Sequence, residues 1–196
     1  MKKTLALVLC VLLCASVVAL AEDASPSQTV TSVTGLFTVD LPEGYAPLST
    51  ELIQSAMDKF GSKELEKAQY DISALQDLDL TAGDYYYSDD FARNFNVQIA
   101  EGSGITLDML ETQADQLGEI LTESYVAFGL SEKDCETVGV EVIGETPFLL
   151  FNVTMLNQEV HQYITVDDNE TMYTLTFTNM NDAERAVVET FHLIEQ

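Results

Sequence analysis

The second half of this chain contains four successive strand-like segments in which apolar residues alternate with polar ones or form a short apolar run. They cover residues 138–142, 148–155, 160–166 and 171–178, with short turn segments between them. Strands joined by such short turns pair antiparallel, because a parallel pair needs a long crossover connection. The pattern therefore predicts an antiparallel meander of four strands.

Three more strands are predicted upstream of this meander. Residues 37–41 alternate between apolar and polar side chains, and residues 84–88 and 94–100 are typical of two paired strands. Residues 22–34 are rich in Ser, Thr and Ala, so we expect a loose leader there.

Helical periodicity marks four further segments. One predicted helix begins after Ser49 or Thr50 and ends at Gly61, and a weaker one follows over residues 62–75. The clearest helix is capped by Thr106 and continues to Leu121, and the last starts at Asn181 and reaches Ile194. Together these elements predict a single α+β domain over residues 35–196, an antiparallel β-sheet flanked by α-helices on both faces (an α/β/α sandwich).

The first 21 residues have the layout of a secretory signal peptide. Lys2 and Lys3 precede an apolar run, and Ala19 and Ala21 occupy the small-residue positions of a cleavage site. We expect a secreted, extracytoplasmic bacterial protein with no membrane span after cleavage. Lipid anchoring is the weaker alternative, because Leu precedes both Cys10 and Cys14 where lipoprotein signals carry a small residue.

The expected mature chain is strongly acidic. Without Lys2 and Lys3, six basic residues remain against 33 acidic ones, a formal charge of −27. Such a surface repels phosphate, which excludes nucleic acid as a partner and disfavours anionic lipid. The same charge keeps an exported protein soluble without any specific partner, and we expect a monomer.

Two features are candidates for a binding site. Asp167, Asp168 and Glu170 form an acidic segment whose oxygens suit Ca²⁺, although Asp and Asn are also ordinary turn residues. Tyr85, Tyr86 and Tyr87 lie in a predicted strand, so that the middle ring faces away from the other two. Such rings serve either as core residues or as a surface that stacks on sugars or partner proteins.

Catalytic chemistry has no recognisable motif in this sequence. HExxH, paired CxxC and GxSxG patterns are all missing, and we assign no catalytic residue, no cofactor-binding residue and no cofactor. Cys135 follows acidic residues that raise the pKa of its thiol, which makes it a poor nucleophile.

Four segments resemble the PsbP-like family of exported bacterial proteins. They are residues 37–45, residues 94–99 with the glycine-rich break and the helix after Thr106, residues 140–147, and residues 173–177 with the helix that follows. That family shares its fold with the PsbP extrinsic subunit of photosystem II and with a Ran-binding nuclear import factor. The resemblance implies an antiparallel sheet between helices and a role as an accessory or binding subunit.

The sequence thus favours a non-catalytic binding or accessory protein of the cell envelope, with an unidentified protein or envelope partner. Two alternatives stay open. The first is an envelope hydrolase that acts on glycans or peptides, which would need converging polar groups with shifted pKa values. The second is a low-affinity binder of divalent cations.

Overall fold

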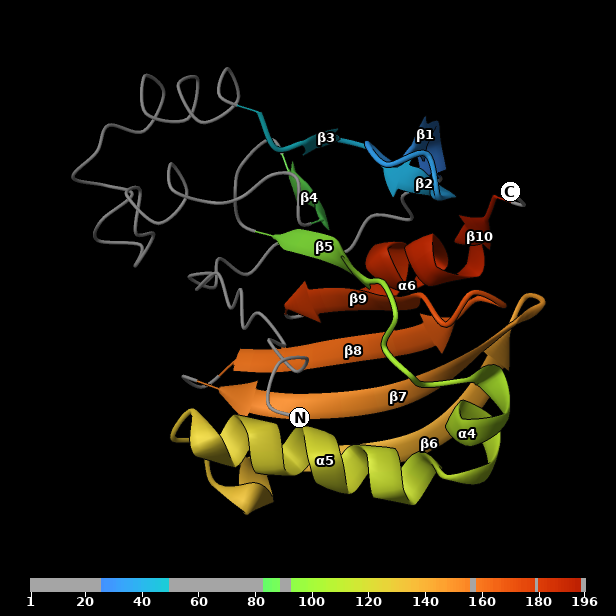
Figure 1. Ribbon diagram of the computed structural model, residues 1–196. Coiled ribbons are helices and arrows are strands. Elements are labelled where there is room, and N and C mark those ends of the chain that lie inside the picture. The colour runs from blue at the N-terminus through green and yellow to red at the C-terminus, as the bar shows by residue number, and fades with distance from the viewer. Residues whose placement is uncertain (1–25, 50–82, 89–92, 156–157, 179, 195–196) are drawn as a thin grey trace.

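The computed structural model describes residues 26–49, 83–88, 93–155, 158–178 and 180–194 (Figure 1). Strands contain 50% of these residues and helical segments 24%. The predicted signal peptide and the two helices predicted between residues 50 and 75 lie outside the described residues. No helix within these ranges is long and apolar enough to span a membrane.

A seven-stranded sheet, in which each strand is antiparallel to its neighbours, forms the larger part of the structure (Figure 1). Its spatial order is β3 (Tyr45–Pro47), β4 (Gly83–Ser88), β5 (Asn94–Ala100), β9 (Met172–Thr178), β8 (Gln158–Val166), β7 (Thr146–Met155) and β6 (Cys135–Ile143). Strands β6 to β9 are neighbours in chain order, which confirms the predicted meander. The predicted pairing of the strands at 84–88 and 94–100 is also confirmed.

A second sheet contains three short strands. It has the order β1 (Pro26–Thr31), β2 (Phe37–Pro42) and β10 (His192–Leu193). Strand β1 lies in the segment predicted to be a loose leader, so that prediction is wrong for residues 26–31. Its sequence, PSQTVT, has no apolar alternation, and its backbone pairing with β2 defines it as a strand.

Helices α4 (Leu107–Thr112) and α5 (Ala114–Ala127) occupy the segment predicted to be one helix, with a break at Gln113. A short 3₁₀ turn, η1 (Glu132–Asp134), precedes β6. The predicted cap is confirmed, because the Thr106 hydroxyl accepts a hydrogen bond from the Met109 N–H at 3.2 Å. The Gln113 backbone, at φ −124° and ψ 29°, leaves the helical region and ends the first helix.

One face of the large sheet is covered by α4 and α5, and we call it the helix face. Its apolar part comes from β7 and β8 and packs against the helices through Leu110, Leu117, Leu121 and Tyr125. Tyr125 stacks on Phe151 with 5.8 Å between ring centroids. Helix α5 lies so close to β6 that a Cβ atom at Gly118 would come within 1.9 Å of the Thr137 hydroxyl oxygen. The small residue at this position therefore sets the depth at which α5 packs.

The opposite face corrects the predicted fold class. Instead of a layer of helices, the three-stranded sheet and the short helix α6 (Asp182–Glu189) cover this face (Figure 1). The described chain is therefore mostly antiparallel β-sheet and is not an α/β/α sandwich. The last predicted helix ends early, because Phe191 packs against Phe37 and Phe148 while residues 192–193 pair with β2.

Candidate functional site

The three consecutive tyrosines are buried. Their exposed fractions are 4% for Tyr85, 1% for Tyr86 and 1% for Tyr87. Tyr86 belongs to the core on the opposite face and stacks on Phe95 with a centroid distance of 4.7 Å, whereas Tyr85 is paired with Asn96 on the helix face. The predicted alternation of the rings is confirmed. Because the rings lie in the interior, they do not form the exposed stacking surface that the sequence allowed.

The acidic segment at residues 167–170 forms a turn between β8 and β9. The Asp167 Oδ1 atom accepts the backbone N–H groups of Asn169 and Thr171, each at 2.9 Å, and Oδ2 accepts the Tyr173 hydroxyl at 3.2 Å. Burial, followed by the charge of Asp167, raises the pKa of Tyr173 to about 12. Asp168 and Glu170 are exposed. Nowhere in the described ranges do three or more His, Cys, Asp or Glu side chains gather as metal ligands.

Cys135 begins strand β6 and is partly buried. Its thiol pKa is raised, first by burial and then by the charge of Asp134. The sequence predicted the direction and the acidic neighbour, but burial contributes more. A thiol with a raised pKa holds less thiolate near neutral pH, which agrees with weak reactivity.

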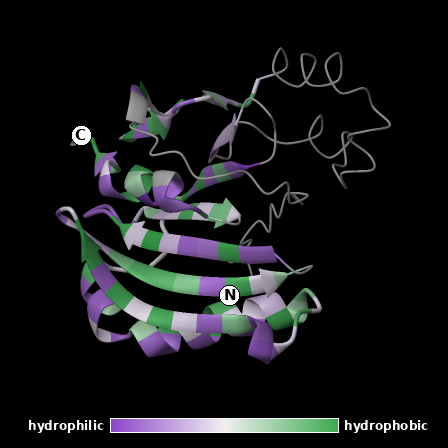
Figure 2. Ribbon diagram, turned by 180° about the vertical axis from the view of Figure 1, so that it is seen from behind, coloured by the Kyte–Doolittle hydropathy of each residue, from purple (hydrophilic) through white to green (hydrophobic). Residues whose placement is uncertain are grey.

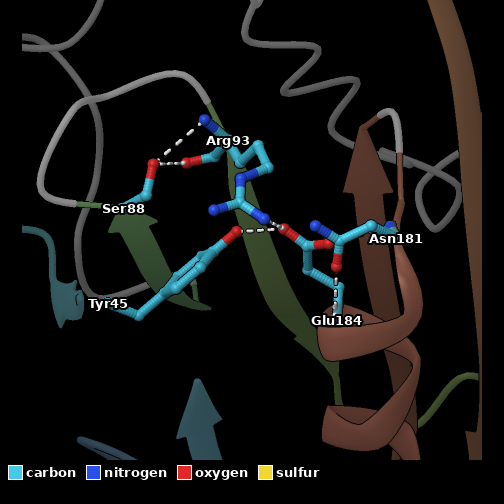
Figure 3. Close-up of polar contacts among 5 residues, drawn as sticks. All are labelled: Tyr45, Ser88, Arg93, Asn181 and Glu184. Carbon is cyan, nitrogen blue, oxygen red and sulfur yellow. Dashed lines mark hydrogen bonds and ion pairs between the residues drawn. The ribbon is translucent and has the colours of Figure 1, made fainter. Parts of the chain in front are cut away.

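A buried carboxylate joins α6 to β3 and to the start of β5 (Figure 3). Glu184 is 1% exposed, and its Oε1 atom accepts the Tyr45 hydroxyl and lies 3.5 Å from a guanidinium nitrogen of Arg93. Its Oε2 atom accepts the Asn181 N–H at 2.8 Å, and the Asn181 side chain accepts the Glu184 N–H at 3.1 Å. This reciprocal pair is the capping box predicted for the last helix.

The other end of the same cluster positions Arg93. The Ser88 hydroxyl and the Arg93 backbone exchange two hydrogen bonds of 3.1 Å, and the guanidinium lies 5.9 Å from the centre of the Tyr45 ring (Figure 3). Both oxygens of Glu184 are therefore already used within the protein. The cluster fastens α6 to the large sheet and presents no unused carboxylate oxygen to a ligand.

Asp84 is a second buried acid, 5% exposed, on β4. Its Oδ1 atom accepts the Val33 N–H at 2.8 Å, which ties the turn after β1 to the large sheet. Burial raises the pKa of Asp84, while the bond from Val33 and the Tyr86 hydroxyl oppose the rise. Loss of water around the carboxylate is thus the dominant effect.

We expect the variant Asp84→Asn to gain stability relative to the original protein as the pH rises. At a pH above the ordinary pKa of 3.8 the unfolded chain has lost the Asp84 proton, whereas the folded protein still holds it. The original protein therefore loses stability as the pH rises from 3.8 toward the raised pKa of Asp84. Asparagine stays neutral and still accepts the Val33 N–H. Urea unfolding of both proteins across the acidic pH range tests this. A stability difference between Asp84→Asn and the original protein that stays constant or shrinks as the pH rises contradicts the prediction.

The helix face changes from apolar to polar between β8 and β5. Figure 2 shows hydrophilic positions along much of β8, an interior strand, and of these Gln162 shares the helix face with the apolar Val160 and Ile164. Here a set of uncharged polar side chains from three adjacent strands, which we call the polar patch, replaces the apolar layer: Asn96 and Gln98 of β5, Thr174 and Thr176 of β9, and Gln162 of β8. Thr176 is the direct cross-strand partner of both Gln162 and Asn96, so the three form one row across the sheet.

Two oxygens of this row have no partner. Gln162 is 5% exposed and donates its amide nitrogen to the Thr176 hydroxyl oxygen at 3.3 Å, but its Oε1 atom is unpaired. Asn96 is 4% exposed, and its Oδ1 atom is unpaired in the same way throughout the described part of the chain. Tyr125 of α5 lies against the Gln162 amide at the border of the patch. The row therefore contains two buried acceptor oxygens without a donor.

Sequence reasoning missed the polar patch. Each strand was recognised, but the search followed charged, nucleophilic and aromatic residues, and single Asn, Gln and Thr residues carry no motif. A signal was present, because Thr174 and Thr176 occupy one side of a strand predicted to be the last of the meander. Such alternation is also common in antiparallel sheets with one solvated face, so it points to a site only once the burial of that face is known.

Comparisons with known proteins were made for the whole chain. No family model matches it, and no curated protein sequence matches it. A crystal structure of a protein from Bacteroides thetaiotaomicron VPI-5482, at 1.50 Å resolution, is similar with a TM-score of 0.47 and 10% sequence identity. The match covers 88% of this chain and 50% of that one, so this chain spans about half the length of the solved protein it matches.

Proposed function

We propose that this chain is an exported, non-catalytic binding protein whose ligand occupies the polar patch on the helix face of the large sheet. The observation that carries this proposal is the pair of unpaired, buried amide oxygens of Gln162 and Asn96. Export rests on the predicted signal peptide at residues 1–21. The acidic surface fits an exported, soluble protein.

A buried acceptor without a donor is unfavourable for a folded protein. Each such group costs roughly 1–3 kcal/mol of lost hydration, and folded proteins rarely retain them without a reason. A ligand that donates hydrogen bonds to Gln162 and Asn96 would recover this free energy on binding. Because both side chains are buried, the bound ligand would be withdrawn from water. Hydrogen bonds in such a buried site are electrostatically stronger than in water.

The proposal makes two opposite predictions for one variant. Gln162→Met keeps the length of the side chain, removes the unpaired oxygen and loses the long 3.3 Å bond to Thr176, so we expect a net gain in the unfolding free energy of the ligand-free protein of at most about 1 kcal/mol. The same change should abolish ligand binding. If the amide is purely structural, Gln162→Met will instead lower the stability, and the proposal fails.

Thermal unfolding of the purified protein tests ligand binding. Separate fractions of bacterial envelope (neutral glycans, anionic polymers and peptides) are added in increasing amounts, and a ligand of the folded state raises the melting temperature with dose. The matched control is Gln116→Met, which removes an exposed amide from α5. We expect the control to respond like the original protein. If no fraction raises the melting temperature, or if a fraction is cleaved, the proposal is contradicted.

A further inference from the structure

We infer that the outer edge of strand β6 binds an extended, basic segment of a partner protein, which adds a strand to the large sheet. Strand β7 separates β6 from the strands of the polar patch, so the inference concerns a second surface and goes beyond the proposed function. It follows from three observations: the unpaired edge of β6, the direction of its backbone groups, and the charge around it.

Strand β6 is the last strand of the seven-stranded sheet and pairs with β7 on one side only. Apart from that pairing, residues 136–143 make no backbone hydrogen bond to any other described part of the chain. None of the nine residues of β6 is buried. At the opposite edge of the sheet, β3 has only three residues and ends in Pro47. Strand addition needs a run of unpaired backbone groups, and of these two edges only β6 is long enough to supply one.

A β-bulge divides β6 into two parts. The register with β7 shifts between Thr137 and Gly139, and Gly139 has a φ of 122°. A bulge bends its strand and disturbs further pairing, which is a common protection of sheet edges. The five residues after the bulge, 139–143, continue in unbroken register to the next turn. The proposed contact is therefore confined to this segment.

Pro147 of β7 determines which backbone groups of this segment face outwards. It stands opposite Val142 and has no N–H, and the two-residue turn between Ile143 and Thr146 makes those two residues a hydrogen-bonded pair. Hydrogen-bonded and non-hydrogen-bonded pairs alternate along an antiparallel ladder, so Val142 and Val140 both belong to non-hydrogen-bonded pairs. Their N–H and C=O groups therefore point away from β7 and toward the edge.

The side chains of the segment define the side chains of the partner. Val140 packs on the helix face, and Val142 lies on the same face with 64% of its surface exposed. Glu141 lies on the opposite face, half-exposed and 3.3 Å from the half-exposed guanidinium of Arg185. Residues that stand opposite each other in neighbouring strands share a face of the sheet. A partner with apolar residues beside the two valines therefore places its intervening residue beside Glu141.

The charge around this edge favours a basic partner. Residues 132–145 contain five acidic residues and one basic residue. A basic side chain gains from this charge, whereas an acidic one is repelled. Pairing of β6 with β6 of a second copy would bring two such acidic segments together, which disfavours that alternative. The occupant is therefore an extended segment in which apolar residues alternate with Lys or Arg.

Fluorescence anisotropy of a labelled, end-capped peptide of alternating Val and Lys tests the inference. When the peptide valines stand opposite Val140 and Val142, the valine N–H groups bond to β6 and the lysine N–H groups point away. Methylation of the valine nitrogens should weaken binding by at least about tenfold, whereas methylation of the lysine nitrogens should leave it unchanged. A peptide of alternating Val and Glu should bind at least about tenfold more weakly than the Val–Lys peptide.

Val142→Pro tests the same contact on the protein. Because the Val142 N–H faces outwards, proline removes a donor to the partner and no bond to β7. We expect peptide binding to weaken by about tenfold or more, while Gln116→Met on the exposed side of α5 leaves it unchanged. The melting temperature of each variant shows whether it is folded, and the two methylated peptides make the same comparison on the original protein.

The outcomes separate this inference from the proposed function. Equal binding of the two methylated peptides, or no binding of the Val–Lys peptide, would overturn the inference. Loss of peptide binding in Gln162→Met but not in Val142→Pro would also overturn it, because the peptide would then be a ligand of the polar patch and the proposed function would stand. A dimer that Val142→Pro dissociates would show that a second copy occupies the edge, which contradicts the choice of partner. Binding that is lost in Val142→Pro and kept in Gln162→Met supports the inference.

Discussion

Replacing Phe95 by alanine is expected to lower the free energy of unfolding by about 3–5 kcal/mol, the usual range for a fully buried phenylalanine. Phe95 is 0% exposed on β5, and its ring is enclosed by three others. It stacks on Tyr86 at 4.7 Å and on Phe177 at 5.2 Å, with Tyr45 at 5.8 Å on another side. Truncation leaves a cavity between β3, β4 and β9 that these rings cannot fill without moving the strands.

Chemical denaturation of the original protein, Phe95→Ala and Phe95→Leu measures this effect. Leucine keeps most of the buried volume and loses the ring stacking, so it should cost clearly less than alanine. Val138→Ala, at a side chain 53% exposed on β6, is the surface control and should change stability by less than about 0.5 kcal/mol. A Phe95→Ala variant as stable as the surface control would show that this ring stack is not part of the core.

Arg93→Met is expected to destabilise the protein by about 2 kcal/mol. The substitution keeps an apolar stem over the Tyr45 ring but leaves the Glu184 carboxylate buried without its cation. Loss of one partner from a fully buried ion pair costs about 3–5 kcal/mol. We expect less here, because the Arg93 side chain is 30% exposed and solvent screens part of the attraction.

A double-mutant cycle with Glu184→Gln isolates the charge interaction. Glutamine is neutral and can still accept from the Tyr45 hydroxyl and the Asn181 N–H, so little charge remains to be compensated. We therefore expect Arg93→Met to cost much less in the Glu184→Gln background than alone. Equal costs in both backgrounds would show that Arg93 contributes through packing on Tyr45 and not through its charge.

The strands that the sequence predicted correctly share one property, a repeated apolar alternation or a continuous apolar run. Residues 37–41 and 172–178 are examples, since burial against a core enforces their pattern. Strands β1 and β10 were missed because backbone pairing with β2 defines them, and pairing leaves no periodic signal in so short a segment. The same pairing contributes to the wrong prediction of an α/β/α sandwich. The helical pattern continues past Glu189 in the sequence, but residues 192–193 instead pair with β2 as a third strand.

The candidate site was less accessible to sequence reasoning than the fold. The tyrosines at 85–87 and the acids at 167–170 stand out in the sequence because they are adjacent, yet the structure uses them for packing and for a turn. Gln162 and Asn96 are 66 residues apart and become neighbours of Thr176 only through strand order. Side chains that converge across interior strands become visible only once the register is known.

The pairing of β10 with β2 has a consequence for the timing of biosynthesis. Residues 192–193 complete a sheet that begins at residue 26, and the Ile194 N–H donates to the Leu36 carbonyl at 2.9 Å. While the chain is being translated, 149 residues separate the completed hairpin of β1 (Pro26–Thr31) and β2 (Phe37–Pro42) from His192, the first residue of its second neighbour β10. Nascent chains interrupted before Leu193 would therefore expose one edge of β2, and proteases or chaperones would meet that edge first.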